Sequence, residues 1–252
     1  MRQAERVGAI LEQLSSHGSV SVADLATELA VSPATIRRDL ELLDDQRLLT
    51  RTHGGAVAQG VLYELPLRYK TAHHQEEKRR IALEAATRVA DGEAVGLTGG
   101  TTTTGVARVL VERQRLTVVT NALNIASELA IRPNLKLVVT GGWARSESYE
   151  LVGPLAEQAL AGLNLDTVFL GADGVSFEGG FMTHHEVEAH TNLALMERAR
   201  RTIVVADSSK IGRTAFARIC SIERVNELIT DAGADAEALA PIREAGVAVT
   251  TV

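Results

Sequence analysis

Two arginines that follow a run of small and polar residues are the first candidates for chemistry in this sequence. Ser32, Ala34 and Thr35 precede Arg37 and Arg38 within the run Val-Ser-Pro-Ala-Thr-Ile-Arg-Arg-Asp-Leu. Small residues at the amino end of a helix let the backbone approach a phosphate group, and an arginine can bind a guanine edge through two hydrogen bonds. This order of residue types predicts contact with double-stranded DNA.

A run rich in glycine and threonine is a second candidate site. It follows the apolar residues Val95-Gly96-Leu97, and we expect a helix directly after it. Glycines let backbone N–H groups converge, and together with hydroxyl groups and a helix amino terminus they form a cradle for an anion. The spacing is neither Gly-x-x-x-x-Gly-Lys-Thr nor Gly-x-Gly-x-x-Gly, so we reject both nucleotide-binding loops. The residues predicted to bind ligand here are Thr98, Gly99, Gly100, Thr101, Thr102 and Thr103.

Further polar residues follow other predicted strands. Taken singly, each has a structural explanation, since Gly-Gly is usually a turn, an Asn after a strand usually caps a helix, and a Lys is usually solvated. The carboxyl ends of parallel strands meet at one edge of a sheet, where ligands bind. This shared position predicts that the whole set contributes to the same ligand site: Asn121, Gly141, Gly142, Asp173 and Lys210, with Lys78 as a further phosphate contact.

Acid and base side chains leave a catalytic alternative open. Asp173, Asp207, Lys210 and the run His184-His185-Glu186 are suited to proton transfer beside a carbonyl group. The carboxylates are spread out in the sequence, however, and we place no second acid beside Asp173. We interpret the His-His-Glu run as the start of a helix, and no histidine four residues later completes a helical zinc pair. We therefore expect no catalytic residues, no metal site and no cofactor.

The elements that position the arginines are short helices. Val7, Ile10, Leu11 and Leu14 recur at helical spacing and predict a first helix that ends near His17. Ser21 with Asp24 has the spacing of a capping box before a second helix, and Ser32 with Pro33 suits the start of a third. The residues from 48 to 57 predict two strands around a Gly-Gly turn, which would form a wing. Arg51 and His53 on this wing are predicted to contact the DNA backbone.

The rest of the chain alternates between strands and helices. Residues 58–75 contain Gly60 and Pro66 and show no clean period, so we expect a linker there. Seven strand-like segments follow, with helical stretches between most of them, and this order predicts βαβ units and a mostly parallel sheet covered on both faces. The predicted strands are Ala94–Leu97, Leu116–Thr120, Leu135–Thr140, Asp166–Leu170, Thr202–Ala206, Leu228–Thr230 and Val247–Thr251.

Composition narrows the classes of protein that fit. The chain has 252 residues, of which 45% are hydrophobic and only 3% aromatic, as expected for an α/β core built from Ala, Val, Leu and Ile. Its single cysteine, Cys220, excludes a disulfide framework. No apolar run is long enough to span a membrane and the first residues are polar, so we expect a cytoplasmic protein.

Charge is an objection to DNA binding. The net charge of the chain is -6, and residues 1–57 hold six Lys or Arg against eight Asp or Glu, a net of -2 (6 minus 8). The alternative for this segment is a three-helix interaction module with a solvated charged face. The basic residues, however, group on the third helix and the wing, whereas Glu41, Asp44 and Asp45 lie later along that helix. We therefore expect DNA binding with modest electrostatic affinity per subunit.

The sequence also resembles a known family. Residues 31–40, followed by Arg-Thr-His-Gly-Gly-Ala at 51–56, closely resemble the helix-turn-helix and wing of DeoR-family bacterial transcription regulators. The second half continues the resemblance through Glu77–Ala82, the Thr-rich loop, Thr120–Leu123, Thr140–Gly142, Gly171–Gly174 and Ala206–Lys210. In many relatives an Asp stands in place of Thr98, so the loop looks closer to the phosphate loops of related isomerases and deaminases.

The resemblance implies two domains and a ligand-controlled switch. Residues 1–57 would form a winged helix-turn-helix domain, 58–75 a linker and 76–252 an α/β sensor domain similar in fold to sugar-phosphate isomerases. We expect a homo-oligomer, a dimer or a tetramer, that represses an operon for carbohydrate metabolism and responds to a phosphorylated sugar. The alternative is a sugar-phosphate isomerase or deaminase-like enzyme fused to a DNA-binding module.

Overall fold

The computed structural model describes residues 3–46, 48–58, 64, 66–71 and 73–252. The chain divides into two compact units, Met1–His73 and His74–Val252. The second half of the range expected as a linker contains a short helix, α4 (Leu67–Lys70), which packs on the first helix of the N-terminal unit. Residues 59–63, 65 and 72 of that range lie outside the described residues.

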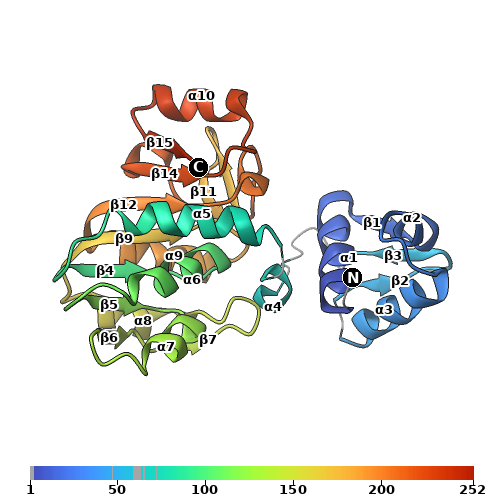
Figure 1. Cartoon of the computed structure of the whole chain (residues 1–252), viewed down its shortest axis with the longest axis horizontal. Coiled ribbons are helices and arrows are strands. Elements are labelled where there is room, and N and C mark those ends of the chain that lie inside the picture. The colour runs from blue at the N-terminus through green and yellow to red at the C-terminus, as the bar shows by residue number, and fades with distance from the viewer. Residues whose placement is uncertain (1–2, 47, 59–63, 65, 72) are drawn as a thin grey trace. The chain divides into compact units, whose positions relative to one another are not determined.

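The N-terminal unit is a helical domain with a small antiparallel sheet (Figure 1). The three expected helices and both strands of the wing are present, and a further strand, β1, pairs with β3 so that the sheet order is β1-β3-β2. The sequence did not predict β1 because its three residues, Ser-Val-Ser, carry no extended pattern. The elements are α1 (Gln3–His17), β1 (Ser19–Ser21), α2 (Val22–Glu28), α3 (Pro33–Asp45), β2 (Thr50–Arg51), β3 (Gly55–Val57) and α4.

Capping residues set where α2 and α3 begin. The Ser21 hydroxyl accepts hydrogen bonds from the backbone N–H groups of Ala23 and Asp24, at 3.1 and 3.4 Å. Ser32 caps α3 by accepting from Thr35 N–H at 3.2 Å, and Pro33 occupies the first helical position. Each cap satisfies N–H groups that a helix leaves without partners at its start. The apolar stripes of the three helices then pack into one core: Val7, Ile10, Leu11, Leu14, Leu25, Ile36, Leu40 and Leu43.

The C-terminal unit is built around a seven-stranded sheet in which every neighbouring pair is parallel (Figure 1). All seven predicted strands are present, in the order β15-β14-β12-β9-β4-β5-β6. The strands are β4 (Ala94–Leu97), β5 (Thr117–Thr120), β6 (Lys136–Val139), β9 (Leu165–Gly171), β12 (Ala199–Val205), β14 (Glu227–Thr230) and β15 (Ala248–Thr251).

Helices cover both faces of this sheet, and alternate residues along each strand pack against opposite layers. Phe169 belongs to one core cluster, whereas its neighbours Val168 and Leu170 belong to the other, as the two-residue period of a strand requires. The helices on the Phe169 side are α5 (Gln75–Ala86), α6 (Thr101–Leu110) and α7 (Leu123–Leu129); those on the other side are α8 (Pro154–Leu160), α9 (Glu186–Met196) and α10 (Ala236–Glu244).

Short antiparallel strands beside the main sheet were not predicted. β7 (Trp143–Ala144) pairs with β8 (Leu151–Val152), and β11 (Gly180–Thr183) lies between β10 (Gly174–Ser176) and β13 (Ala217–Cys220). Within residues 143–220, all of which the structure describes, β8 follows β7, β11 follows β10 and β13 follows β12 without an α-helix between them, so the alternation that predicted the main strands does not mark these segments. None of the helices in the described ranges has the length and apolar character needed to cross a membrane.

Candidate functional site

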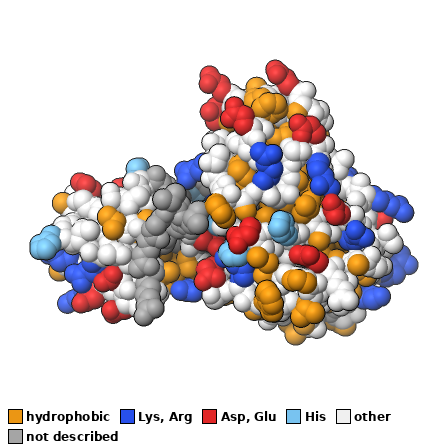
Figure 2. Space-filling model, turned by 180° about the vertical axis from the view of Figure 1, so that it is seen from behind, with side chains coloured by type: hydrophobic (Ala, Val, Ile, Leu, Met, Phe, Trp, Pro, Cys, Tyr) orange, Lys and Arg blue, Asp and Glu red, His pale blue; other side chains and the backbone are white. Residues whose placement is uncertain are grey.

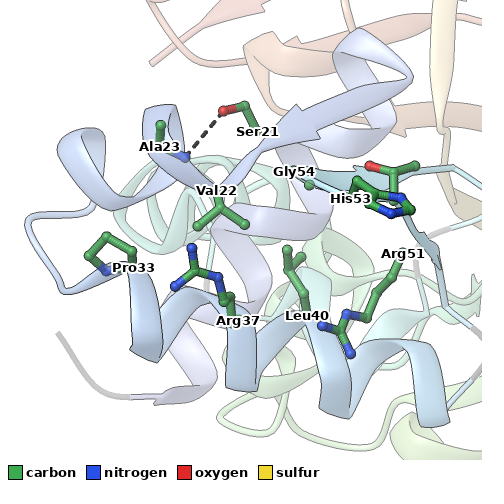
Figure 3. A pocket seen from close by; sticks show the side chains of 11 residues that line it. Ser21, Val22, Ala23, Pro33, Arg37, Leu40, Arg51, His53 and Gly54 are labelled. Atoms are coloured by element: carbon green, nitrogen blue, oxygen red, sulfur yellow. Dashed lines mark hydrogen bonds between the residues drawn. The ribbon is translucent and has the colours of Figure 1, made fainter.

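A groove of about 270 Å³ lies between α2, α3 and the wing of the N-terminal unit (Figure 3). Arg37 reaches it from α3 and Arg51 from β2, and His53 stands on the turn that follows β2. The groove thus brings together three of the seven residues predicted to bind DNA. Its full lining is Ser21, Val22, Ala23, Pro33, Arg37, Leu40, Arg51, Thr52, His53, Gly54 and Gly55.

The other four predicted residues lie on the first turns of α3. Ala34 and Arg38 are exposed, as is Ser32. The hydroxyls of Ser32 and Thr35 lie 2.9 Å apart, and Ser32 also caps the helix, so these two side chains hold the amino end of α3 in shape. This end of α3 therefore presents small side chains and two exposed arginines, a surface that fits the major groove of DNA.

Two acidic residues of α3 lie close to Arg51 of the wing, although the sequence predicted that the acidic and basic residues would be separated. Glu41 Oε1 is 3.8 Å from Arg51 Nη1, and Asp44 Oδ1 accepts a hydrogen bond from Arg51 N–H at 3.4 Å. The expectation that the acids of α3 stand apart from the basic residues is therefore wrong for Arg51, because the wing folds back over the second half of α3. Lys and Arg side chains are likewise interspersed with Asp and Glu on the face drawn in Figure 2.

A buried ion pair fixes α3 against α1. Arg6 and Asp39 pair through two hydrogen bonds, of which Arg6 Nη2 to Asp39 Oδ1 spans 3.0 Å, and both side chains are nearly inaccessible to solvent. The hydrogen bond and charge of Asp39 raise the pKa of Arg6 in spite of burial. This pair sets the position of the helix that carries Arg37 and Arg38. The sequence contained no signal for it, since the two residues lie 33 positions apart.

In the C-terminal unit, the strand order reverses between β4 and β9. β5 and β6 continue the sheet on one side of β4, and β9, β12, β14 and β15 continue it on the other. Ligands of parallel α/β sheets bind beyond the strand ends at such a reversal. Thr98 joins the two strand ends here, because its buried hydroxyl accepts a hydrogen bond from Gly171 N–H at 3.0 Å. Thr98 therefore holds the ends of β4 and β9 together at this reversal.

The Gly-Thr loop turns directly into α6. Gly100 is the residue before the helix and has a φ of 121°, which favours glycine. The hydroxyls of Thr103 and Thr104 donate back to the Gly100 carbonyl at 3.0 and 2.6 Å. These hydroxyls thus hold the loop, and the N–H groups of the first turn of α6, which have no partners within the helix, are the groups suited to an anion.

A buried carboxyl group that the sequence did not reveal lies against this loop. A Cβ atom on Gly99 would stand 2.6 Å from Cδ of Glu150, far inside van der Waals contact, so any other residue at this position would force the Glu150 side chain to move. Asn121 Nδ2 donates to Glu150 Oε2 at 2.9 Å and to Asn192 Oδ1 at 3.1 Å. Burial, together with the charges of Glu188 and Asp173, raises the pKa of Glu150 well above its usual value against the opposing effect of the Asn hydrogen bonds.

The sequence placed no second acid beside Asp173, whereas the structure brings Glu188 there. Thr183 Oγ1 lies 2.6 Å from Glu188 Oε1 and 3.3 Å from Asp173 Oδ2, so one hydroxyl links the two carboxyl groups. Arg145 pairs with Glu188, and His184 Nε2 is 3.9 Å from Asp173 Oδ1. Sequence reasoning missed Glu188 because only the fold of β11 and α9 brings it to Asp173.

The His-His-Glu run begins a helix, as expected. The His185 side chain accepts from Val187 N–H at 3.2 Å and caps α9, which begins at Glu186. No set of three His, Cys, Asp or Glu side chains within the described residues has the arrangement of a metal site.

Lys78 and Lys210 meet at Asp207. Lys78 Nζ, on α5, is 3.7 Å from Asp207 Oδ2, and Asp207 caps the short helix Ser208–Lys210 by accepting from Ser209 N–H at 3.1 Å. Burial opposes ionisation of Asp207, but Lys78, the Ser209 hydrogen bonds and Lys210 together lower its pKa. Both predicted lysines therefore stand beside a buried carboxylate that follows β12.

The predicted glycine pair after β6 shapes the entry to the β7–β8 hairpin. Gly141 has a φ of 73°. A Cβ on Gly142 would lie 2.7 Å from the Val152 carbonyl oxygen, so β8 packs directly on its backbone. These contacts position β8, and Glu150, which directly precedes β8 and forms an antiparallel bridge with Ala122, lies against Gly99.

Each of the two units matches a known protein domain. Residues 6–60 match the DeoR-like helix-turn-helix domain, and residues 73–232 match the DeoR C terminal sensor domain. The chain is 39% identical over 250 residues to the HTH-type transcriptional regulator GlpR of Haloferax volcanii, covering 99% of this chain and 98% of that protein. It is 34% identical over 232 residues to the glycerol-3-phosphate regulon repressor of Escherichia coli K12, covering 92% of each.

Among solved structures, ribose 5-phosphate isomerase A from Methanocaldococcus jannaschii matches with a TM-score of 0.41 and 22% identity over 54% of each chain. The two domain matches and the full-length relatives agree with the winged helix-turn-helix and the parallel α/β sheet described above. The chain belongs to the DeoR family of DNA-binding transcriptional regulators.

Proposed function

We propose that this protein is a repressor of an operon for carbohydrate metabolism and that a phosphorylated sugar bound in the C-terminal unit controls it. The observation that carries the effector half is the Gly99–Gly100 loop, which delivers the amino end of α6 to the point where the strand order reverses. A helix amino terminus at this position favours a phosphate group. The glycerol-3-phosphate regulon repressor among the relatives supports this ligand class.

The DNA half rests on α3 and the wing. Arg37 and Arg38 are exposed on α3, and Arg51 and His53 stand on the wing beside the same groove. In this proposal α3 enters the major groove, where its arginines read base edges, and the wing contacts the phosphate backbone. Because one unit offers few basic contacts, we infer that a homo-oligomer, a dimer or a tetramer, binds repeated half-sites.

In the proposed effector site, one set of groups contacts the phosphate of the ligand and another set contacts its hydroxyl groups. The backbone of residues 99–103 would bind the phosphate group. Asn121 and Asp173, which follow β5 and β9, offer an amide and a carboxylate for sugar hydroxyl groups, and Lys78 and Lys210 add positive charge beside Asp207. A ligand that binds one arrangement of the chain more tightly than another changes the affinity of the chain for DNA. This change cannot exceed the difference between the affinities of the ligand for the two arrangements.

A binding experiment tests both halves. The full chain is titrated against DNA from immediately upstream of its own gene and against scrambled DNA, at near-physiological salt, by fluorescence anisotropy with and without a panel of sugar phosphates. We expect selective binding that one sugar phosphate releases. Selective binding that ignores every compound would contradict the effector half, and equal affinity for that fragment and for scrambled DNA would contradict the assignment of this operator.

An isomerase is the second candidate, and one observation favours it: Asp173 and Glu188 share the Thr183 hydroxyl close to Glu150. Paired carboxyl groups are suited to moving a proton beside a carbonyl group. Arg145, however, pairs with Glu188 inside the unit, so the fold already engages this carboxylate in an ion pair. We therefore propose that the site binds its ligand without turnover.

A further inference from the structure

Glu150 is an acidic side chain that packs against the Gly99 loop. Its carboxyl group fills the space where a Cβ of residue 99 would lie, and it is 3% exposed. In the described part of the chain, no Lys, Arg or His side chain forms an ion pair with it. An ionised carboxylate at this position would repel a phosphate group bound by the loop.

The groups that face Glu150 are neutral or acidic. Gly99 after β4, Asn121 after β5 and Asn192 on α9 carry no charge. Glu188 on α9 and Asp173 after β9 both act on Glu150 as like charges. The nearby cations are committed elsewhere, because Arg145 pairs with Glu188 and His184 lies 3.9 Å from Asp173. The surroundings therefore favour a neutral carboxyl group.

We propose that Glu150 binds the effector in its protonated form, as a hydrogen-bond donor to the anion held by the Gly99 loop, so that effector affinity depends on this one proton. The proposal rests on the effector site described above and names the group that makes that site sensitive to pH. A neutral carboxyl group can donate one hydrogen bond, whereas the ionised form can only accept. Loss of the proton thus replaces an attraction with a repulsion.

The sign of the pH dependence follows from this exchange. The anion stabilises the protonated form of Glu150, so its pKa is higher in the complex than in the free chain. Binding therefore takes up a proton once the pH exceeds the pKa of the free chain. Affinity then falls as pH rises, by up to about tenfold per pH unit for a single proton.

Isothermal titration of the full chain with inorganic phosphate tests the proposal. Measurements run from about pH 8 to about pH 10, where phosphate already carries its second negative charge. They compare the wild-type chain with Glu150→Gln, which has the same shape but cannot ionise, and with Glu112→Gln, an exposed site on the loop after α6. Titrations of the wild-type chain in two buffers of different ionisation enthalpy count the protons taken up, and this readout needs no variant.

We expect the wild-type chain and Glu112→Gln to lose affinity together as pH rises, while Glu150→Gln stays flat, and we expect the wild-type chain to take up a proton on binding wherever its affinity falls. Parallel curves for the wild-type chain and Glu150→Gln, or a fall in the affinity of the wild-type chain without proton uptake, would overturn the role of Glu150 and leave the phosphate site standing. Absence of phosphate binding at every pH in every chain would overturn both the effector site and this inference.

Discussion

Arg37 lies on the exposed face of α3 and lines the groove that Arg51 and His53 border from the wing. Its neighbour Arg38 is also exposed, but it does not line this groove. Arg51 is held by Glu41 and Asp44, which lower the positive potential around it. Of the arginines on α3 and the wing, Arg37 therefore combines exposure with a place in the groove and is best placed to read a base.

Replacement of Arg37 tests this assignment. Arg37→Ala should weaken operator binding by about 1–3 kcal/mol, the usual effect of losing one arginine contact to a base. Sugar-phosphate binding by the C-terminal unit should not change. Fluorescence anisotropy on operator and scrambled DNA measures the effect, and Arg132→Ala, an exposed arginine after α7, is the matched control. Unchanged operator affinity in Arg37→Ala would remove this residue from the DNA-binding surface.

Gly99 gives a prediction for the effector site. Gly99→Ala should disturb the loop, because the added Cβ would stand 2.6 Å from Cδ of Glu150. Overpacking of this kind typically costs about 1–3 kcal/mol. We expect loss of the sugar-phosphate response with DNA binding retained, measured by anisotropy.

Two further variants separate this effect from a general one. Gly162→Ala adds the same methyl group where nothing lies within 4 Å, and it should behave as the wild-type chain. Gly99→Ala combined with Glu150→Ala removes the overlapping carboxyl group and should restore the fold of the loop, as judged by thermal unfolding. A normal sugar-phosphate response in Gly99→Ala alone would place the ligand elsewhere.

At the scale of elements, α3 depends on α1 for its position. The apolar residues of both helices share one core, and the Arg6–Asp39 pair adds a directional contact inside it. A buried ion pair adds little to the free energy of folding, since both charges lose their hydration, and its main effect is to fix the relative position of the two helices. Removal of one partner leaves the other charge buried and uncompensated.

Asp39→Ala should therefore destabilise the N-terminal unit by about 3–5 kcal/mol. Hydrogen exchange of the α1 and α3 amides measures this unit separately from the C-terminal one. The double variant Arg6→Met with Asp39→Leu replaces the pair by apolar side chains and should recover most of the stability. Wild-type protection of α1 and α3 in Asp39→Ala would show that the ion pair does not hold the two helices together.

At the scale of the whole molecule, one chain carries a DNA-binding unit and a sheet whose reversal point holds three carboxyl groups. The relatives that span its length are transcriptional regulators. The groups at this sheet edge suit both the binding of a sugar phosphate as an effector and its conversion as a substrate. Binding and catalysis recruit the same kinds of groups, so a direct test of turnover separates these two uses.

Incubation of the full chain with pentose and hexose phosphates distinguishes them. We expect no isomerised or deaminated product, because the site has Glu188 paired with Arg145. Chromatography of the mixture after prolonged incubation gives the readout. Product that disappears in a Glu188→Gln variant would establish the isomerase alternative.

The sequence alone determined the elements and their class. Helical spacing, the caps Ser21 and Ser32, and the βαβ alternation predicted the three helices, the wing and all seven strands of the parallel sheet. These signals are local, because a cap or an apolar period is written within a few consecutive residues. Because the strands were predicted to be parallel, the sequence also predicted that Asn121, Asp173 and the Gly99 loop lie at the same edge of the sheet.

Only the tertiary structure decided which side chains meet. Glu150 against Gly99, Glu188 beside Asp173, and Asp39 against Arg6 join residues that lie 51, 15 and 33 positions apart, and no local pattern in the sequence brings them together. Their effect on charge depends on burial and on neighbours from other elements, which no local pattern records. The hairpin of β7 and β8 is an example, because it carries Glu150 to the Gly99 loop. Its strands have only two residues each, so the position of the hairpin depends on packing against Gly142 and not on a sequence pattern of its own.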